Sequence, residues 1–314
     1  MRILITGATG LVGGSLLPRL LEAGHEAVAV TRRDNPSLPP GCRAVKADPA
    51  VDGPWLDEID SCDAVVHLAG ENVFAKRWST RFKKQLYDSR VNSTRLIAER
   101  LARKPTRSDG SPRLLVSASA VGYYGPHEDT ELVEDDPPGT DFLAEICIAW
   151  EQAANPARAA GVRVVNPRVG MVLAPNEGAL KKLLLPFKLF IGGPVGDGKQ
   201  WISWIHIDDV VGFIMYALAT PTTQGAYNAT APEPLTNWGF SKTLATVLRR
   251  PCWLPVPRWA LRILLGEVAS VVTKGQRAIP QRAVQAGYSF IHPDLEEALR
   301  HLLKRPLAQS NISG

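Results

Sequence analysis

The sequence predicts an α/β protein with a doubly wound parallel sheet and a smaller substrate-side cap toward its C-terminal end. Two observations predict this class. Apolar segments of strand length alternate with segments of helical periodicity from the N-terminus to about residue 170. Three glycines also occupy the junction between the first expected strand and the first expected helix. The length of 314 residues and the hydrophobic content of 45% suffice for one large domain with an appendage.

The first strand, turn and helix carry a nucleotide-binding pattern. In "RILITGATGLVGGSLLPRLLEAGHEAVAV", residues 3–6 form an apolar run, leucines follow at helical spacing, and residues 27–30 form a second apolar run. Gly7 allows a tight turn, Gly10 lets the backbone approach a pyrophosphate, and Gly13 permits close packing of helix on strand. We therefore expect a Rossmann-type domain whose dinucleotide contacts Gly7, Thr9, Gly10, Leu11, Val12 and Gly13.

The end of the second strand predicts which dinucleotide binds. A site that prefers NAD places an acidic residue there to hold the ribose 2′-hydroxyl, whereas this sequence has Thr31, Arg32 and Arg33. Two guanidinium groups can bind a 2′-phosphate through charge-assisted hydrogen bonds. The sequence thus favours NADP(H). The next residue, Asp34, leaves the alternative that a carboxylate serves the ribose instead.

Further apolar runs predict buried parallel strands at residues 43–48, 64–70, 113–119 and 162–168, with a helix at 89–102. Ligands of such sheets bind beyond the carboxyl ends of the strands. We therefore expect cofactor contacts from Leu68, Ala69, Gly70 and Glu71, and from Arg90 on the following helix. An arginine solvated at the surface is the competing interpretation of Arg90.

The alternation loosens after residue 170, which sets the predicted domain limits. Residues 1–170 form the NADP-binding domain, and part of 205–230 returns to it. Residues 171–304 form the cap, with a small C-terminal domain at about 250–303. The cap is expected to contain an amphipathic helix within residues 255–272 and a last helix with Asp294 as its N-cap. Residues 305–314 are expected to be a frayed tail.

Composition narrows the function classes. The net charge of +5 is spread along the chain, which argues against a nucleic-acid partner and is compatible with an anionic small-molecule substrate. Four distant cysteines and six histidines without clustering in the sequence predict neither disulfides nor a metal site. No stretch has the pattern of a signal peptide or a membrane span. We expect a cytoplasmic protein that is a monomer or a homodimer, with a substrate of unknown identity.

Ordered motifs carry a resemblance to a known family. "TGATGLVG", "HLAG", "SASAVGYYG" and "WIHIDDV" resemble the landmarks of the extended short-chain dehydrogenase/reductases, from residue 1 to about residue 220. More narrowly, "HLAGEN", "LLPFKLFIGGPVGDGKQWISWIHIDD" and "IPQRAVQAGYSFIHPDLEEAL" are similar to an atypical branch called epimerase-family proteins. Bacterial members of that branch are sometimes called cell-division inhibitors. The narrower resemblance extends to about residue 303 and implies a small extra C-terminal domain.

The resemblance also implies catalytic residues, and here the sequence departs from the family. Members use a serine and, about 25 residues later, a Tyr-x-x-x-Lys helix in which the ammonium group stabilises the tyrosine phenolate. The matching serine is Ser119. The helix expected within residues 139–154 offers Leu143 with Cys147 or, one position off, Phe142 with Ile146. The chain has no tyrosine between Tyr124 and Tyr216 and no lysine between Lys104 and Lys181, so the usual pair is absent.

Two hypotheses of function follow. In the first, the protein is an NADP(H)-dependent oxidoreductase or epimerase-like enzyme, with Ser119 and Tyr123 as its catalytic candidates. In the second, it binds NADP(H) without turnover, as a sensor or regulatory protein. Intact phosphate-binding glycines without the Tyr-Lys pair favour the second hypothesis. A retained serine and a substrate-side cap favour the first.

Overall fold

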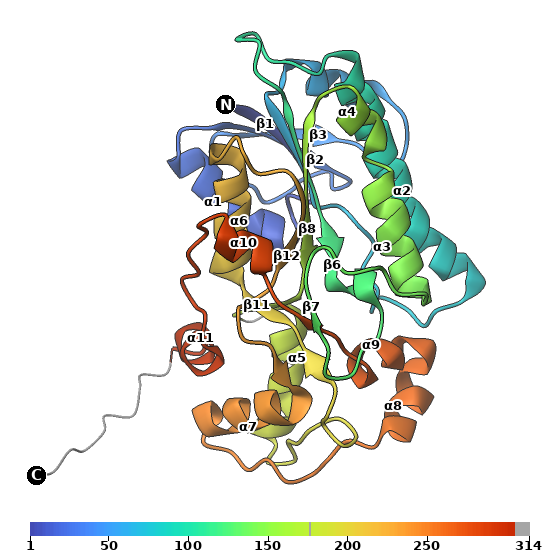
Figure 1. The fold of residues 1–314 in the computed structure, drawn as a ribbon, viewed down its shortest axis with the longest axis vertical. Helices are drawn as coiled ribbons and strands as arrows, with labels where there is room; N and C mark the ends of the chain where they lie inside the picture. The colour runs from blue at the N-terminus through green and yellow to red at the C-terminus, as the bar shows by residue number, and fades with distance from the viewer. Residues whose placement is uncertain (176, 305–314) are drawn as a thin grey trace, which may run out of the picture.

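A computed structural model describes residues 1–175 and 177–304, and the expected frayed tail at 305–314 lies outside these residues. Its centre is a parallel sheet of order β12-β8-β5-β4-β1-β2-β3, in which β6 pairs with β8 beyond the end of β5 (Figure 1). The strands are β1 (Arg2–Thr6), β2 (Glu26–Thr31), β3 (Cys42–Lys46), β4 (Ala64–His67), β5 (Leu114–Ser117), β6 (Ser119–Ala120), β8 (Arg163–Val169) and β12 (Gly225–Ala229). The predicted Rossmann-type fold is confirmed.

The central strands form because their residues are apolar on both faces. Every residue of β4 and β5 is buried, as expected for a parallel sheet that helices cover on both sides. The register places Thr6 beside His67, and His67 beside Ser117, at the carboxyl ends of β1, β4 and β5. The loops that follow these three strands therefore meet at one edge of the sheet.

Helices cover the two faces of the sheet separately (Figure 1). On one face, α1 (Leu11–Glu22) packs against α6 (Ile207–Ala219). On the other face, α2 (Thr80–Arg103) packs against α3 (Phe142–Gln152) and α4 (Asn155–Ala159), and the 3-10 helix η1 (Pro54–Ser61) precedes β4. Helix α2 begins nine residues earlier than predicted because Ser79 caps it by accepting a hydrogen bond from the Phe82 amide.

The cap lies beyond the carboxyl ends of the strands, at the lower end of Figure 1. Its helices are α5 (Gly178–Lys188), α7 (Asn237–Leu248), α8 (Arg258–Leu265), η3 (Gly266–Ala269), α9 (Ser270–Thr273) and α11 (Leu295–Leu302). Helix α10 (Gln281–Gln285) lies higher in Figure 1, where it packs against β12 of the main sheet. Its short strand pairs are β9 (Met171–Ala174) with β11 (Trp204–His206), β10 (Trp201–Ile202) with β13 (Leu235–Thr236), and β14 (Arg277–Ala278) with β7 (Glu131–Leu132).

Two details of the cap bear on the sequence predictions. The helix expected within residues 255–272 is interrupted at Gly266, whose φ of +66° ends α8. The last helix begins as expected, since the Asp294 side chain accepts a hydrogen bond from the Glu297 amide at 2.9 Å. The first prediction was therefore wrong in extent, and the second is confirmed.

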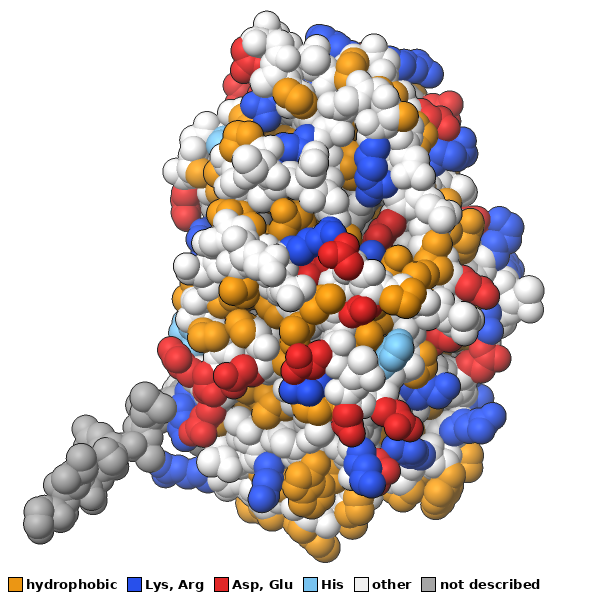
Figure 2. Space-filling model, viewed as in Figure 1, with side chains coloured by type: hydrophobic (Ala, Val, Ile, Leu, Met, Phe, Trp, Pro, Cys, Tyr) orange, Lys and Arg blue, Asp and Glu red, His pale blue; other side chains and the backbone are white. Residues whose placement is uncertain are grey.

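The surface shows no segregation of charge on the face drawn in Figure 2, where acidic and basic side chains alternate. Hydrophobic side chains gather at the lower end of this view, and α8 there exposes Trp259, Ile263 and Leu264. Within residues 1–175 and 177–304, no helix is both long enough and apolar enough to cross a membrane.

Candidate cofactor-binding and active site

The turn after β1 is built around glycines that tolerate no side chain. Gly7 has a φ of +73°, and a Cβ there would lie 2.7 Å from the carbonyl carbon of Leu68. A Cβ at Gly13 would lie only 2.3 Å from the carbonyl oxygen of Gly7. The first contact fixes the turn against the end of β4, and the second lets α1 pack closely on β1. Both roles are those that the sequence predicts.

The start of α1 is open to a ligand. Gly10 is its N-cap residue, with no side-chain hydrogen bond to the helix and no acidic residue in the first turn. The amide groups of Leu11 and Val12 at the first helical positions thus keep their capacity to donate. Thr9 lies in the same turn and is half-buried. Such a helix start carries partial positive charge and is suited to a phosphate group.

The end of β2 carries the two arginines predicted to read a 2′-phosphate. Thr31 is buried, whereas Arg32 and Arg33 are exposed. A guanidinium nitrogen of Arg32 lies 3.8 Å from a carboxylate oxygen of Glu71 in the loop after β4. Among the described residues, no ion pair is found for Arg33. The structure thus presents two cations at this edge, and within the described part of the chain only Arg32 forms an ion pair.

Asp34 is engaged elsewhere. Its carboxylate forms an ion pair with Lys46 at the end of β3, and both side chains are exposed. This contact draws the carboxylate toward β3, which weakens the alternative that Asp34 serves a ribose.

The loop after β4 is held by Arg90 of α2. The Arg90 guanidinium donates to the carbonyl oxygens of Glu71 at 2.9 Å and Leu86 at 3.1 Å, and it lies 5.2 Å from the Trp150 ring. A Cβ at Gly70 would meet this guanidinium at 3.2 Å. The structure therefore excludes a freely solvated Arg90. The loop residues Leu68, Ala69, Gly70 and Glu71 lie at the carboxyl-end edge of the sheet, where a dinucleotide is expected to bind.

A buried histidine ties three of these segments together. His67 Nδ1 lies 2.5 Å from Thr6 Oγ1, and its Nε2 lies 3.0 Å from Ser93 Oγ on α2. Burial, followed by the nearby Arg90 charge, lowers the pKa of His67 to about 3. The imidazole is therefore neutral at physiological pH and has a structural role.

We expect this histidine to make the protein sensitive to acid. The folded-state pKa of His67 lies below its unfolded value of 6.5, so its stabilising contribution is complete above pH 6.5 and is lost as pH falls toward 3. Between pH 6.5 and 5.5, wild type should lose about 1 kcal/mol more of its free energy of unfolding than His67→Asn. Urea denaturation at the two pH values measures this difference, and equal losses would contradict the assignment.

Ser119 belongs to a buried charged network. Its hydroxyl donates to Glu151 Oε1 at 2.8 Å, and Arg168 donates to both carboxylate oxygens of Glu151 at 2.9 and 3.0 Å. Arg168 also donates to the Tyr124 hydroxyl at 2.9 Å, and that hydroxyl lies 2.8 Å from Asn228 Oδ1. Burial lowers the pKa of Arg168, but the bonds to Glu151 outweigh it and raise the pKa overall. The network links β6, β8, β12 and α3.

Tyr123 and Tyr124 differ in availability. Burial, which outweighs the nearby Arg168, raises the pKa of Tyr124 to about 12, and its ring is fully buried. Tyr123 is half-buried, with the Arg168 guanidinium 3.4 Å from its ring centre. No hydrogen bond from the Tyr123 hydroxyl to another described residue is found. Tyr123 is thus the phenol that remains able to bind a ligand.

Helix α3 spans the residues in which the resemblance leads us to expect the Tyr-x-x-x-Lys helix. A Cβ at Gly122 would meet Leu143 at 3.6 Å and the Cys147 sulfur at 3.9 Å, so these two side chains face the segment after β6. Burial, followed by Glu151, raises the pKa of Cys147 to about 12, which keeps it a thiol. Of the two alignments that the sequence allows, the structure favours Leu143 with Cys147.

Sequence reasoning missed Glu151 as the partner of Ser119. The signal was present, because Leu143, Cys147 and Glu151 are spaced four residues apart and so share one face of α3. It also missed that His206, His292 and His301 come together with Asp208. The lack of clustering in the sequence therefore does not carry over to the fold, because residues distant in the sequence meet at the start of α6.

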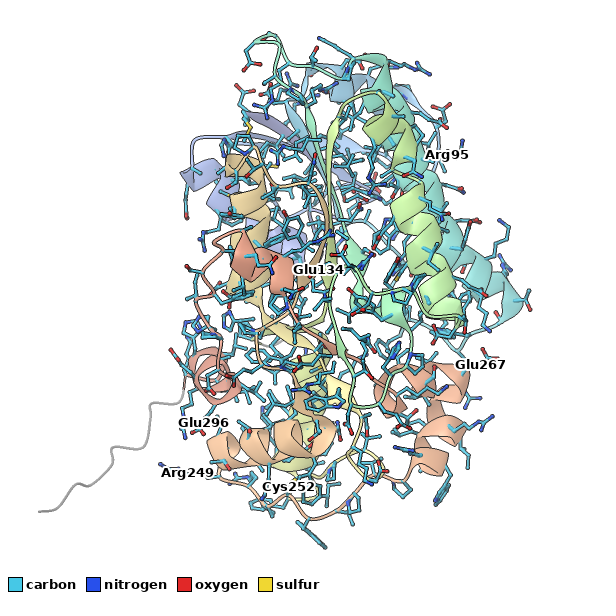
Figure 3. All side chains as sticks on the ribbon, viewed as in Figure 1. Arg95, Glu134, Arg249, Cys252, Glu267 and Glu296 are labelled. Carbon is cyan, nitrogen blue, oxygen red and sulfur yellow. The ribbon has the colours of Figure 1, made fainter. Side chains whose placement is uncertain are left out.

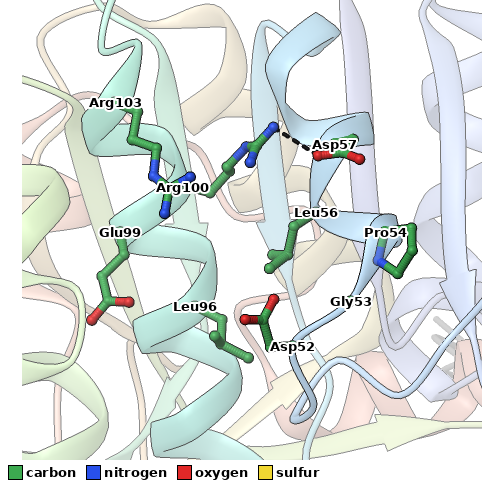
Figure 4. Close-up of a pocket in the computed structure, with 9 residues that line it drawn as sticks. All are labelled: Asp52, Gly53, Pro54, Leu56, Asp57, Leu96, Glu99, Arg100 and Arg103. Carbon is green, nitrogen blue, oxygen red and sulfur yellow. Dashed lines mark hydrogen bonds and ion pairs between the residues drawn. The ribbon is translucent and has the colours of Figure 1, made fainter.

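A buried glutamate adjoins the network around Arg168, whereas a hollow region lies at the other end of the sheet. Glu134, labelled in Figure 3, accepts from the backbone amides of Asn228 and Arg282 and so joins the sheet to α10. A pocket of about 550 Å³ lies between η1 and the second half of α2, where Arg100 pairs with Asp57 (Figure 4). Because η1 directly precedes β4, this pocket is at the opposite end of the strands from the glycine turn.

Comparisons with known proteins agree with this arrangement. The sequence profile of the NAD dependent epimerase/dehydratase family matches residues 3–230, and that of a domain of unknown function (DUF1731) matches residues 256–302. The Arabidopsis thaliana epimerase family protein SDR39U1 homolog, described as chloroplastic, is 39% identical over 97% of this chain and 87% of its own length. The human epimerase family protein SDR39U1 is 36% identical over 96% of this chain and 100% of its own length.

A solved structure shows the same fold over nearly the whole chain. The crystal structure of human SDR39U1 (isoform 2) with NADPH has a TM-score of 0.83 and 33% identity, and the match covers 98% of this chain and 100% of that one. The resemblance to epimerase-family proteins that the motifs carry is thereby confirmed. The chain belongs to the NAD dependent epimerase/dehydratase family.

Proposed function

We propose that this protein is an NADP(H)-dependent oxidoreductase that acts on a carbonyl group of a small molecule. The observation that carries the proposal is the open glycine turn, which ends at an uncapped helix start on the same edge of the sheet as Ser119 and Tyr123. A dinucleotide on this turn would extend along the edge toward the cap. The relative solved with NADPH supports the choice of cofactor.

The residues present fit NADP(H). Side chains at Gly7 and Gly13 would collide with backbone atoms, so both positions require glycine. The resulting turn has the form that binds a pyrophosphate in Rossmann-type domains. The amide groups of Leu11 and Val12 would donate to its oxygens. Arg32 and Arg33 would bind the 2′-phosphate. For this contact the ion pair between Arg32 and Glu71 would have to break. Arg90, already fixed on the loop after β4, would hold the nicotinamide half in position through Gly70 and Glu71.

Cofactor preference is the first consequence. NADPH should bind at least about tenfold tighter than NADH, equivalent to ~1.4 kcal/mol, because Arg32 and Arg33 favour a 2′-phosphate. The Arg32→Ser, Arg33→Ser double variant should lose this preference. Fluorescence titration of both cofactors at one ionic strength measures it. Equal affinities of wild type for NADPH and NADH would contradict the assignment.

When bound, the cofactor supplies the hydride, and the protein must supply a proton donor for the oxygen that becomes an alkoxide. Tyr123 is the candidate donor, because its hydroxyl has no partner among the described residues and Arg168 lies against its ring. Ser119 is the second, and its hydroxyl must turn from Glu151 toward the substrate. Arg90 contributes a cation near Cys147, where the family has its lysine.

Rates of variants test these roles. Ser119→Ala and Tyr123→Phe should each lower the rate of NADPH-dependent carbonyl reduction about tenfold or more, since loss of one donor to a developing oxyanion typically costs ~3 kcal/mol. Cys147→Ala, the matched control on α3, should stay within about threefold because a buried neutral thiol donates nothing to this oxygen. Stopped-flow oxidation of NADPH with aldehydes, ketones and quinones measures all three. Damage confined to Cys147→Ala would overturn the placement of the site.

A second candidate function rests on a specific observation. The Ser119 hydroxyl is satisfied by Glu151, and α3 has neither tyrosine nor lysine, as expected of a protein that binds NADP(H) without turnover. Such a protein would act as a sensor or regulatory partner. NADPH that binds with 1:1 stoichiometry but is oxidised by no carbonyl compound would favour this function over the first.

The proposal includes a cellular compartment and an oligomeric state. Cys42, Cys62, Cys147 and Cys252 are all free, which fits a reducing compartment such as the cytoplasm. The chain would work as a monomer or a homodimer on a small-molecule substrate, without nucleic acid.

A further inference from the structure

Three histidines that are far apart in the sequence meet at the start of α6. His206 ends β11 and caps α6, His292 lies in the segment before α11, and His301 lies in the last turn of α11. His206 Nε2 is 3.1 Å from His301 Nδ1, and Asp208 has a carboxylate oxygen 3.6 Å from His206 Nδ1 and 3.8 Å from His292 Nε2. One potential ligand atom from each of these four residues lies within 4.8 Å of the other three.

The cluster is held in place by its surroundings. His206 is fully buried and His292 is 7% exposed. The carboxylate of Asp209 accepts from the backbone amides of Ile291 at 2.6 Å and His292 at 3.0 Å, which fixes the segment that carries His292. His301 is exposed and Asp208 half-buried, so the cluster opens to solvent on one side. An ion from solution can therefore reach a preformed arrangement of side chains.

An unsatisfied nitrogen within the cluster points to a missing ligand. His292 Nδ1 is buried and has no hydrogen-bond partner among residues 1–175 and 177–304, which is unfavourable for a polar atom. Neutral imidazole is the form that binds metal ions.

We propose that His206, Asp208, His292 and His301 bind one divalent transition-metal ion of the zinc class. Three imidazoles and a carboxylate form a ligand set that suits Zn²⁺ in a tetrahedral site. Two ligands at ~2.0–2.1 Å from one zinc ion are about 3.4 Å apart, close to the 3.1 Å between His206 Nε2 and His301 Nδ1. The ion would fasten α11 and the segment before it to the start of α6.

Loading moves one proton within the cluster. In the metal-free state, His206 Nδ1 accepts from the Asp208 amide at 3.0 Å, so Nε2 carries the proton and donates to His301 Nδ1. When the ion binds Nε2, this proton passes to Nδ1, and the cap bond to the Asp208 amide is given up. The ring stays neutral throughout.

Metal titration of untagged, chelator-treated protein tests the proposal. Co²⁺ should bind at one equivalent and give the visible absorption of a tetrahedral site. His301→Gln and Asp208→Asn should each weaken Co²⁺ at least tenfold. His127→Gln removes an exposed histidine outside the cluster and is the matched control, which should bind as wild type does.

Thermal unfolding provides a second readout. Zn²⁺ should raise the melting temperature of wild type and of His127→Gln but not of His301→Gln. His301 is exposed, and a glutamine amide oxygen can accept from His206 Nε2 in its place, so His301→Gln should melt like wild type in the absence of metal. Failure of wild type to bind one equivalent of Co²⁺, or equal affinity in wild type and His301→Gln, would overturn the site.

Discussion

Replacing Gly10 with valine is expected to abolish NADPH binding while the protein stays folded. Gly10 has a φ of −87° and a ψ of 178°, a conformation open to any residue, and a Cβ there meets only the Gly7 carbonyl oxygen at 3.2 Å. The added side chain would instead occupy the space through which a pyrophosphate approaches α1. The Kd for NADPH should rise at least about 100-fold, equivalent to ~2.8 kcal/mol. Fluorescence titration measures it.

Gly13→Val is the matched comparison. Its Cβ would lie 2.3 Å from the Gly7 carbonyl oxygen and 2.8 Å from the Ala8 Cα, so helix and strand must separate. This variant should lose stability as well as binding, whereas Gly10→Val should keep the unfolding midpoint of wild type within a few degrees. Retained NADPH binding by Gly10→Val would remove the assignment of the glycine turn.

Glu151→Ala is expected to cause the largest loss of stability in the candidate active site. The side chains of Arg168 and Glu151 are only 4% and 13% exposed, and the pair is bidentate. Removing the carboxylate leaves a buried guanidinium without its counter-ion, which typically costs about 3–5 kcal/mol. Urea denaturation should show this as a lower midpoint with an unchanged slope.

A double-mutant cycle separates the lost pair from the lost side chain. The Glu151→Leu, Arg168→Met double variant removes both charges, so it should be more stable than Glu151→Leu alone. If the stability lost by the double variant equals the sum of the losses in Glu151→Leu and Arg168→Met, the ion pair has no coupling energy. In that case the network around Ser119 would not depend on Glu151.

The parallel sheet was predictable because its signals are local. Residues 3–6, the three glycines and residues 27–30 form one continuous segment, and their local signals all indicate the same strand-turn-helix-strand unit. The predicted strands match β1, β2, β3, β4, β5 and β8 to within a few residues. The prediction that β3 is buried was wrong, because β3 is the edge strand of the sheet and its residues are exposed or half-buried. The break of the cap helix at Gly266 was less visible, because apolar spacing continues on both sides of the glycine.

The candidate site was only partly predictable because its contacts are long-range. Ser119 and Tyr123 follow a recognisable strand, but the partner of Ser119 is 32 residues away on α3. Arg90 holds a loop 19 residues before it, and only the structure shows that its side chain turns inward. The histidine cluster joins residues 95 positions apart, and no sequence spacing encodes such a contact.

Transfer of deuterium from NADPH labelled at its hydride position tests the proposed function most directly. Wild type would be incubated with the labelled cofactor and a panel of carbonyl compounds, and the masses of the products would be measured by mass spectrometry. Gly10→Val, which is expected not to bind the cofactor, is the control. We expect an alcohol product that carries one deuterium from wild type only. Tight NADPH binding without labelled product from any compound in the panel would contradict the proposed oxidoreductase function and favour a sensor or regulatory protein.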